Sequence, residues 1–158
     1  MWKISFLSLL IVCCGFSRAE IVTSCDGDYV AKIGGRREVV VSRGGRRVAA
    51  AKVDHHINGG AFSLDDSVLV VFGLPFSADP RSPQVAHLSI YFIGKNMRLA
   101  EKEVYGGGVY DAAFSEDRKS IVVNGQFGVD VIDVERGQVH TFDAAHVPKF
   151  EFQKCDKK

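Results

Sequence analysis

The chain has 158 residues, of which 46% are hydrophobic and 25% are charged, with 20 lysine and arginine side chains against 19 aspartate and glutamate side chains. This length suits one domain with an adequate core, and because no linker or break in composition divides the chain, we expect a single domain. The balanced total charge is uninformative, and we expect no nucleic-acid partner because the chain has the pattern of an exported protein, described next.

The first nineteen residues have the pattern of a secretory signal peptide. Lys3 precedes an apolar run from Ile4 to Phe16, and the small residues Ser17 and Ala19 stand just before an expected cut ahead of Glu20. The alternative is an uncleaved membrane anchor, but an apolar run of about a dozen residues is short for a bilayer span of roughly 20. We therefore expect a periplasmic protein whose single all-β domain is residues 20–158, with no membrane attachment after cleavage.

Removal of that segment leaves two cysteines, Cys25 and Cys155, near opposite ends of the remaining chain. In an oxidising compartment the two are expected to form one disulfide that joins the first element to the last. The alternative is a pair of unpaired thiols, which are a liability in an exported protein.

From Tyr29 to Val53 the sequence predicts three strands separated by the glycine pairs Gly34-Gly35 and Gly44-Gly45, since glycine accepts turn conformations at little cost. The same segment concentrates basic residues, which are Lys32, Arg36, Arg37, Arg43, Arg46, Arg47 and Lys52. Such a concentration fits an acidic protein partner, an anionic envelope surface or simply a solvated strand face. A polar connection is expected from Asp54 to Gly60.

Residues 61–71 and 113–123 repeat one pattern. An apolar pair leads to Ser63 or Ser115, an acidic turn reverses the chain, and an apolar run rich in β-branched residues follows, which indicates a hairpin. The second copy continues into a further strand at 129–134, a turn containing Gly137 and another strand. This succession is typical of a β-propeller blade.

Between the two copies lies a proline-rich segment, residues 73–86, that predicts a long irregular loop. A strand at Leu88–Ile93, a turn at Gly94–Asn96, a polar strand ending near Val104 and a turn at Gly106–Gly108 follow it. The expected fold is all-β, with about three antiparallel sheets in an open, β-propeller-like arrangement closed by the terminal disulfide, because roughly 40 to 45 residues make one blade. A sandwich or a small barrel is the alternative.

No catalytic motif is present, and we expect neither an enzyme nor a bound cofactor. The adjacent His55 and His56 invite a metal hypothesis. Neighbouring residues of an extended strand point to opposite faces, however, so we expect no metal site there.

The order of these parts resembles the periplasmic immunity proteins that protect Gram-negative bacteria from peptidoglycan-cleaving amidase effectors of the type VI secretion system, in the group paired with NlpC/P60-like cysteine amidases. The resemblance covers most of residues 20–158. It rests on a signal peptide followed by Cys25, the strand at 68–72 entering a proline-rich loop, the strand at 88–93, Gly107-Gly108 leading into residues 113–119, the strands at 121–123 and 129–134, and the late Cys155.

The resemblance implies a non-enzymatic inhibitor that inserts loops into the active-site cleft of a cognate secreted peptidoglycan amidase. By position, the partner-binding loop would be Asn124, Gly125, Gln126, Phe127 and Gly128. The family's loop is longer and offers serine, so Asn124 or Gln126 would supply the polar contact here and Phe127 the apolar anchor. Phe127 could instead be a half-buried aromatic at a strand end.

Two other functions remain open on the sequence. One is a periplasmic inhibitor of a lysozyme-type wall hydrolase. The other is a non-catalytic, propeller-like module that binds a ligand or assembles with copies of itself.

Overall fold

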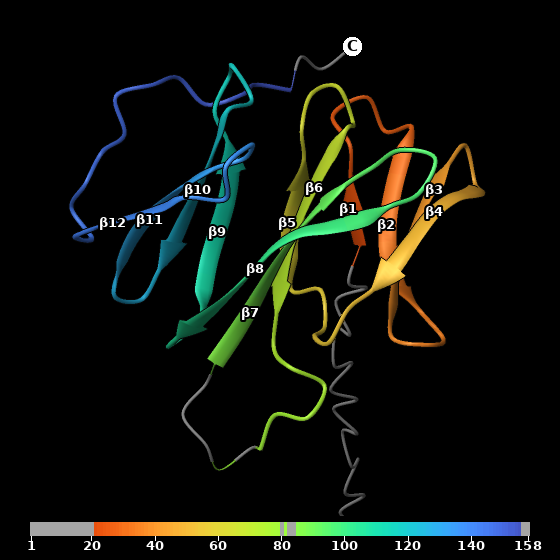
Figure 1. Ribbon diagram of the computed structural model, residues 1–158, viewed down its shortest axis with the longest axis horizontal. Coiled ribbons are helices and arrows are strands. Elements are labelled where there is room, and N and C mark those ends of the chain that lie inside the picture. Colours follow the sequence, from red (N-terminus) through yellow and green to blue (C-terminus); the bar gives the residue numbers. More distant parts are fainter. Residues whose placement is uncertain (1–20, 80, 82–84, 156–158) are drawn as a thin grey trace, which may run out of the picture.

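The computed structural model describes residues 21–79, 81 and 85–155, so the predicted signal peptide lies outside the described residues. In these ranges the regular elements are twelve β-strands, which form three four-stranded antiparallel sheets (Figure 1). Each strand pairs with its neighbours in sequence, so each sheet is a simple meander. The expected three-sheet all-β architecture is therefore confirmed.

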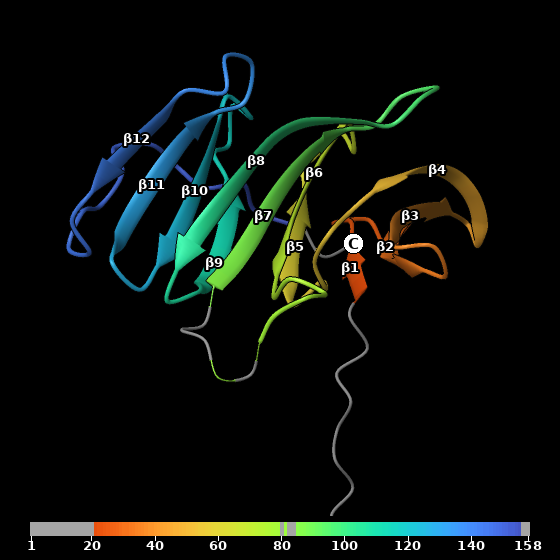
Figure 2. The same cartoon turned by 60° about the horizontal axis from the view of Figure 1, so that its bottom comes forward.

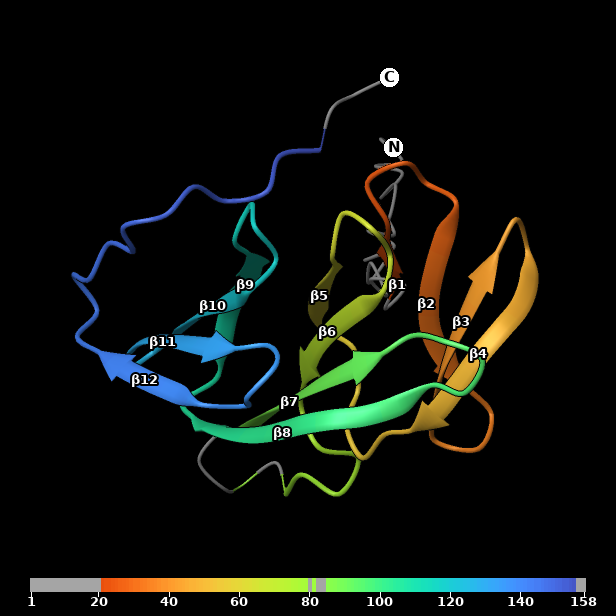
Figure 3. The same ribbon diagram turned by 45° about the horizontal axis from the view of Figure 1, so that its top comes forward.

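The first sheet consists of β1 (Ile21–Thr23), β2 (Tyr29–Gly34), β3 (Glu38–Arg43) and β4 (Arg46–Lys52). The second consists of β5 (Gly59–Phe62), β6 (Val68–Gly73), β7 (Val85–Phe92) and β8 (Arg98–Gly106). The third consists of β9 (Val109–Phe114), β10 (Ser120–Gly125), β11 (Gly128–Asp133) and β12 (Val139–Phe142). The first strands of successive sheets, β1, β5 and β9, lie next to one another, and β4, β8 and β12 form the outer edges (Figures 1 and 3).

The hydrophobic core lies in two layers, one on each side of the middle sheet. Leu69 and Val71 of β6 face the first sheet, whereas Val70 and Phe72 face the third. Every residue of β6 is buried, which explains why its sequence is a continuous apolar run and not an alternating one. Burial of a side chain such as Leu69 contributes about 2 kcal/mol to stability.

Each sheet begins with the same turn between its first and second strands. A buried serine donates a hydrogen bond to the carboxylate of the aspartate two residues later, at 2.6–2.7 Å, and accepts one from the backbone N–H five residues later, at 3.0 Å. The three pairs are Ser24 with Asp26, Ser63 with Asp65, and Ser115 with Asp117. Arg118 of the third turn forms an ion pair with Asp65 of the second, which links the two sheets.

The C-terminal segment (residues 143–155) runs from β12 back across these turns toward the first sheet (Figure 3). Phe152 forms an isolated bridge with Ser115, and the Gln153 side-chain amide donates to the Phe62 carbonyl at 2.8 Å. The segment then reaches the first turn, where Cys155 forms a disulfide with Cys25 across a sequence separation of 130. The predicted disulfide is thus present, and it joins the first sheet to the end of the chain.

The expected polar connection from Asp54 to Gly60 is shorter than predicted, because β5 already begins at Gly59. A Cβ at Gly59 would lie 2.4 Å from the Phe72 ring, and one at Gly60 would lie 2.2 Å from the Val70 carbonyl oxygen. The glycine pair therefore allows β5 to lie closely against β6, instead of forming a turn.

The meander places alternate connections at opposite ends of the molecule. One end carries the three serine–aspartate turns and the C-terminal segment, and the other carries the β10–β11 turn and the start of the proline-rich loop (Figure 1). Within the described ranges, no helix is long and apolar enough to cross a membrane.

Candidate functional site

The five residues predicted to bind a partner lie together on the β10–β11 hairpin. Asn124 and Gly125 end β10, Gly128 begins β11, and Gln126 and Phe127 form the two-residue turn between them. The Phe127 side chain is 77% exposed, so the half-buried alternative is wrong. Asn124 lies within the strand, paired with Val129 and Asp111, which leaves Gln126 and Phe127 at the tip.

Glycines on two segments, the hairpin itself and the link between β8 and β9, fix the position of this turn. A Cβ at Gly128 would lie 2.3 Å from the Phe142 carbonyl oxygen, so β12 approaches the hairpin too closely for any larger residue. Gly107 has a φ of +76°, and the Gln126 side-chain amide lies where its Cβ would be. The Gln126 N–H also donates to the Gly108 carbonyl at 3.4 Å. The tip is therefore held by its neighbours and is not a free loop.

A groove of about 160 Å³ lies beside the tip. It is lined by Glu103, Val104, Tyr105, Gly106, Gly125, Gln126, Phe127, Gly128, Asp130 and Thr141. The groove brings the end of β8 from the middle sheet against the hairpin of the third sheet. Its rim is apolar, since Val104 is 60% exposed beside Phe127.

The interior of the groove is acidic. Burial raises the pKa of the Glu103 carboxyl, and the nearby charges of Glu101 and Asp130 raise it further. Burial also raises the pKa of the Tyr105 hydroxyl, with a second contribution from Asp130. No hydrogen bond of ordinary geometry reaches the Tyr105 hydroxyl from the described residues, although the Asp130 carboxylate lies close enough to raise its pKa. A partner group that donates hydrogen bonds or carries positive charge would suit this lining.

The residues of β8 were not predicted as part of the site. The sequence feature that could have placed β8 at the site is the Gly106–Gly108 run. So short a link between two sheets forces the end of β8 to lie against the strand that follows. Tyr110, just beyond the link, is 69% exposed and lies where the β9–β10 register shifts by one residue.

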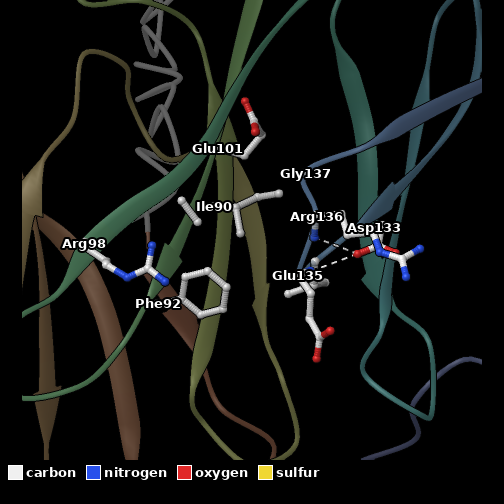
Figure 4. Close-up of a pocket in the computed structure, with 10 residues that line it drawn as sticks. Ile90, Phe92, Arg98, Glu101, Asp133, Glu135, Arg136 and Gly137 are labelled. Atoms are coloured by element: carbon white, nitrogen blue, oxygen red, sulfur yellow. Dashed lines mark hydrogen bonds between the residues drawn. The ribbon is translucent and has the colours of Figure 1, made fainter.

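A second cleft, of about 320 Å³, lies between β7–β8 and the β11–β12 turn (Figure 4). Arg98 lies over the Phe92 ring at 4.4 Å on one side, and Glu135 and Arg136 come from the turn on the other. The Asp133 carboxylate accepts hydrogen bonds from the backbone N–H groups of Glu135 and Arg136, at 3.0 and 2.8 Å, which shapes the turn. Charges of both signs line this cleft, so its chemistry selects no single class of ligand.

The two histidines considered for a metal site, His55 and His56, make other contacts. The His55 ring is fully buried, with Nδ1 2.6 Å from the His56 carbonyl oxygen and Nε2 2.9 Å from the Ser89 hydroxyl. His56 contacts the Phe76 ring instead, at 4.6 Å between centroids. No group of three or more potential metal ligands occurs among the residues that the structure describes.

The neighbouring Asp54 carboxylate forms an ion pair with Lys102 and a hydrogen bond with His87, whose Nδ1 lies 3.1 Å away. Burial opposes ionisation of Asp54, but the hydrogen bonds from Lys102 and His87 outweigh it and lower the pKa of this carboxyl. These contacts connect the β4–β5 connection to β7 and β8. Because Ser89 is only 1% exposed, the Ser89–His55 pair is closed to any substrate.

The start of the proline-rich loop is anchored on the same connection. The His56 N–H donates to the Leu74 carbonyl at 2.8 Å, the Phe76 N–H donates to the Asp54 carbonyl at 3.0 Å, and His55 forms a bridge with Pro75. Residues 80 and 82–84 of this loop lie outside the described ranges.

Comparison with known proteins supports the architecture. A scan of protein-family models gave no match, and neither did a search of curated proteins. Among solved structures, the β-propeller domain of Cps50 (Swd1) from Myceliophteria thermophila matches with a TM-score of 0.53 and 10% sequence identity. The fold is propeller-like. The match covers 79% of this chain but 41% of that domain, so the chain spans about two-fifths of the propeller's length.

Proposed function

We propose that this protein is a periplasmic, non-enzymatic inhibitor that binds a secreted peptidoglycan amidase and inserts the β10–β11 turn into its active-site cleft. The Cys25–Cys155 disulfide is typical of an oxidising compartment outside the cytoplasm, and the amino-terminal sequence pattern supports export. The resemblance of the sequence to immunity proteins of type VI secretion amidases supports the class of partner.

The observation that carries the proposal is the exposure of Phe127 at the tip of a fixed two-residue turn. A large aromatic side chain that is 77% exposed leaves apolar area that a partner pocket would remove from water. Because glycine contacts already hold the turn, little conformational freedom is lost on binding. Both properties are typical of the anchor residues that dominate protein interfaces.

The groove beside the turn supplies polar complementarity. Gln126 shares the tip with Phe127 and offers amide donors, while Glu103 and Asp130 offer acceptors in the groove. Occupation of an enzyme cleft by this tip would exclude substrate without any chemistry by the inhibitor, so inhibition would follow binding in a one-to-one ratio.

The test measures affinity and residual wall hydrolysis against a panel of secreted peptidoglycan amidases and lysozymes. Phe127→Ala is expected to weaken binding to the cognate amidase by about tenfold or more and to restore hydrolysis, the size expected for a hot spot. The matched control is Leu64→Ala, which truncates a 43% exposed side chain at the opposite end of the molecule. This control should bind as the native protein does.

Undiminished inhibition by the Phe127→Ala protein would remove the turn from the interface. Inhibition of a lysozyme in place of every amidase would assign the protein to the other class of wall-hydrolase inhibitor.

A further inference from the structure

A third groove, of about 470 Å³, lies between β4 of the first sheet and the β7–β8 turn of the second. It is lined by Arg47, Val48, Ala49, Ala50, Lys95, Asn96 and Met97. The β7–β8 turn extends over β4 at this place (Figures 2 and 3). The groove lies away from the β10–β11 turn, so it is separate from the site proposed above.

One wall of the groove is the edge of a sheet. β4 is the last strand of the first sheet and pairs only with β3 among the described strands. Its pairing skips one residue, because Arg47 lies opposite Ser42 and Ala49 lies opposite Val41. The skipped residue, Val48, is 45% exposed. The edge therefore presents unpaired backbone groups together with an exposed apolar side chain.

The charge of the groove has one sign. Arg47 and Lys95 line it, Asn96 adds an amide, and none of its seven lining residues is acidic. The Arg47 guanidinium lies 3.5 Å from Oε2 of Glu38, and Nζ of Lys52 lies 3.3 Å from Oε1 of the same carboxylate. Two cations therefore share one negative charge. Lys95 has no ion pair within the described ranges. A surplus of positive charge therefore faces the groove.

The surplus extends over the first sheet as a whole. Residues 21–53 contain the seven basic side chains named in the sequence analysis and three acidic ones, Asp26, Asp28 and Glu38. The positive electrostatic potential of this sheet attracts an acidic partner. The groove is the place on the sheet where an acidic segment of that partner can lie.

We propose that this groove binds an acidic, extended peptide segment of a protein partner. Carboxylates of the segment pair with Arg47 and Lys95, its backbone lies along the free edge of β4, and an apolar side chain covers Val48. A protein segment fits better than a small anion because the groove joins a strand edge, an exposed valine and two separated cations.

The test uses the purified protein and two fluorescent peptides of about nine residues, one alternating glutamate with valine and the other alternating glutamine with valine. We expect the glutamate peptide to bind and the glutamine peptide not to bind, with affinity that falls as salt rises. Arg47→Gln and Lys95→Gln should each weaken binding by about fivefold, and the double variant should weaken it by about 25-fold. Arg36→Gln, an equal change of charge at the β2–β3 turn, is the matched control and should weaken binding by less than about twofold, because salt screens a distant charge.

Amide resonances report the location directly. The glutamate peptide should shift those of Val48, Ala49 and Ala50 in the native protein. The proposal is overturned if the peptide does not bind, if Arg36→Gln weakens binding as much as Lys95→Gln, or if inorganic phosphate competes as strongly as the peptide. Native-like thermal unfolding of each variant confirms that a lost signal is not a lost fold.

Discussion

At the scale of single residues, His55 shows how a polar group is accommodated in this core. A carbonyl oxygen can only accept, so Nδ1 must carry the hydrogen that faces the His56 carbonyl. Burial disfavours a second proton on the ring, so Nε2 of the neutral ring accepts from the Ser89 hydroxyl and both nitrogens are satisfied. Burial lowers the pKa of His55 below its ordinary value of 6.5, because the charged ring would lose its hydration.

This lowered pKa has a consequence for stability. Below pH 6.5 the unfolded chain binds a proton at His55 that the folded protein does not, so acid favours unfolding. We expect the free energy of unfolding to fall by up to about 1.4 kcal/mol per pH unit between pH 6.5 and the folded-state pKa. Urea unfolding at a series of pH values from 7.5 to 5.0 measures this change in the free energy of unfolding.

The exposed His140 provides the control for that experiment. His55→Gln should flatten the pH dependence in this range, whereas His140→Gln should keep it. An equal slope in the native and His55→Gln proteins would show that another group titrates with unfolding.

At the scale of elements, the serine–aspartate turn is the repeated unit of the structure. In each copy the serine hydroxyl satisfies the backbone N–H that opens the second strand, and the aspartate holds the hydroxyl in place. The residue after the aspartate has positive φ in all three copies, at Gly27, Asp66 and Arg118. The turn thus sets the geometry with which each sheet starts.

Removal of one of these hydroxyls should be costly. Ser115→Ala leaves the partly buried Ser120 N–H without its 3.0 Å partner, and the expected loss of stability is about 1–3 kcal/mol. Ser77→Ala, the same change at an exposed position of the proline-rich loop, should lie within about 0.5 kcal/mol of the native protein. Chemical denaturation measures the free energy of unfolding of both variants and of the native protein. Equal stability of the two variants would mean that water satisfies the N–H in the folded protein.

Sequence patterns revealed two of the three copies. Those at Ser63 and Ser115 follow an alanine–phenylalanine pair and precede long apolar strands, so their hairpins are recognisable locally. The copy at Ser24 follows β1, which has only three residues, and it contains Cys25 and Gly27 where the others have larger residues. A strand so short gives no alternating pattern, and the first strand of the first sheet was therefore not predicted.

The candidate site also has one part that was predicted from the sequence and one part that was not. The hairpin at 124–128 is a local feature, and its loop was assigned by position from the resemblance, between the strands expected at 121–123 and 129–134. The groove beside it depends on β8, which belongs to another sheet and meets the hairpin only through packing between sheets. Such contacts depend on how the sheets pack together, and a short pattern of residues carries no information about that.

At the scale of the whole molecule, the three sheets of the described residues form two cores but no closed ring. Propellers of typically four or more blades close on themselves, whereas here the C-terminal segment returns from β12 to the first sheet. Its contacts with the second and third sheets include the Ser115–Phe152 bridge and the Gln153–Phe62 hydrogen bond. The Cys25–Cys155 bond is the covalent part of this closure.

Loss of the disulfide should therefore act on the segment and on global stability together. Cys25→Ser with Cys155→Ser is expected to lower the free energy of unfolding by about 2–5 kcal/mol. Limited proteolysis should then cut first near Lys149, because the segment has lost its anchor. Cleavage elsewhere at an equal rate would show that the sheets, and not the segment, depend on the bond.

The same disulfide also orders events in time. A chain made from its amino terminus presents Cys25 early and its partner 130 residues later, when all three sheets have already been synthesised. Until then Cys25 is a free thiol, open to exchange with any disulfide in its compartment. An incomplete chain can therefore form its hairpins one by one, but it cannot form the Cys25–Cys155 disulfide. That bond then distinguishes the complete protein chemically from its folding intermediates.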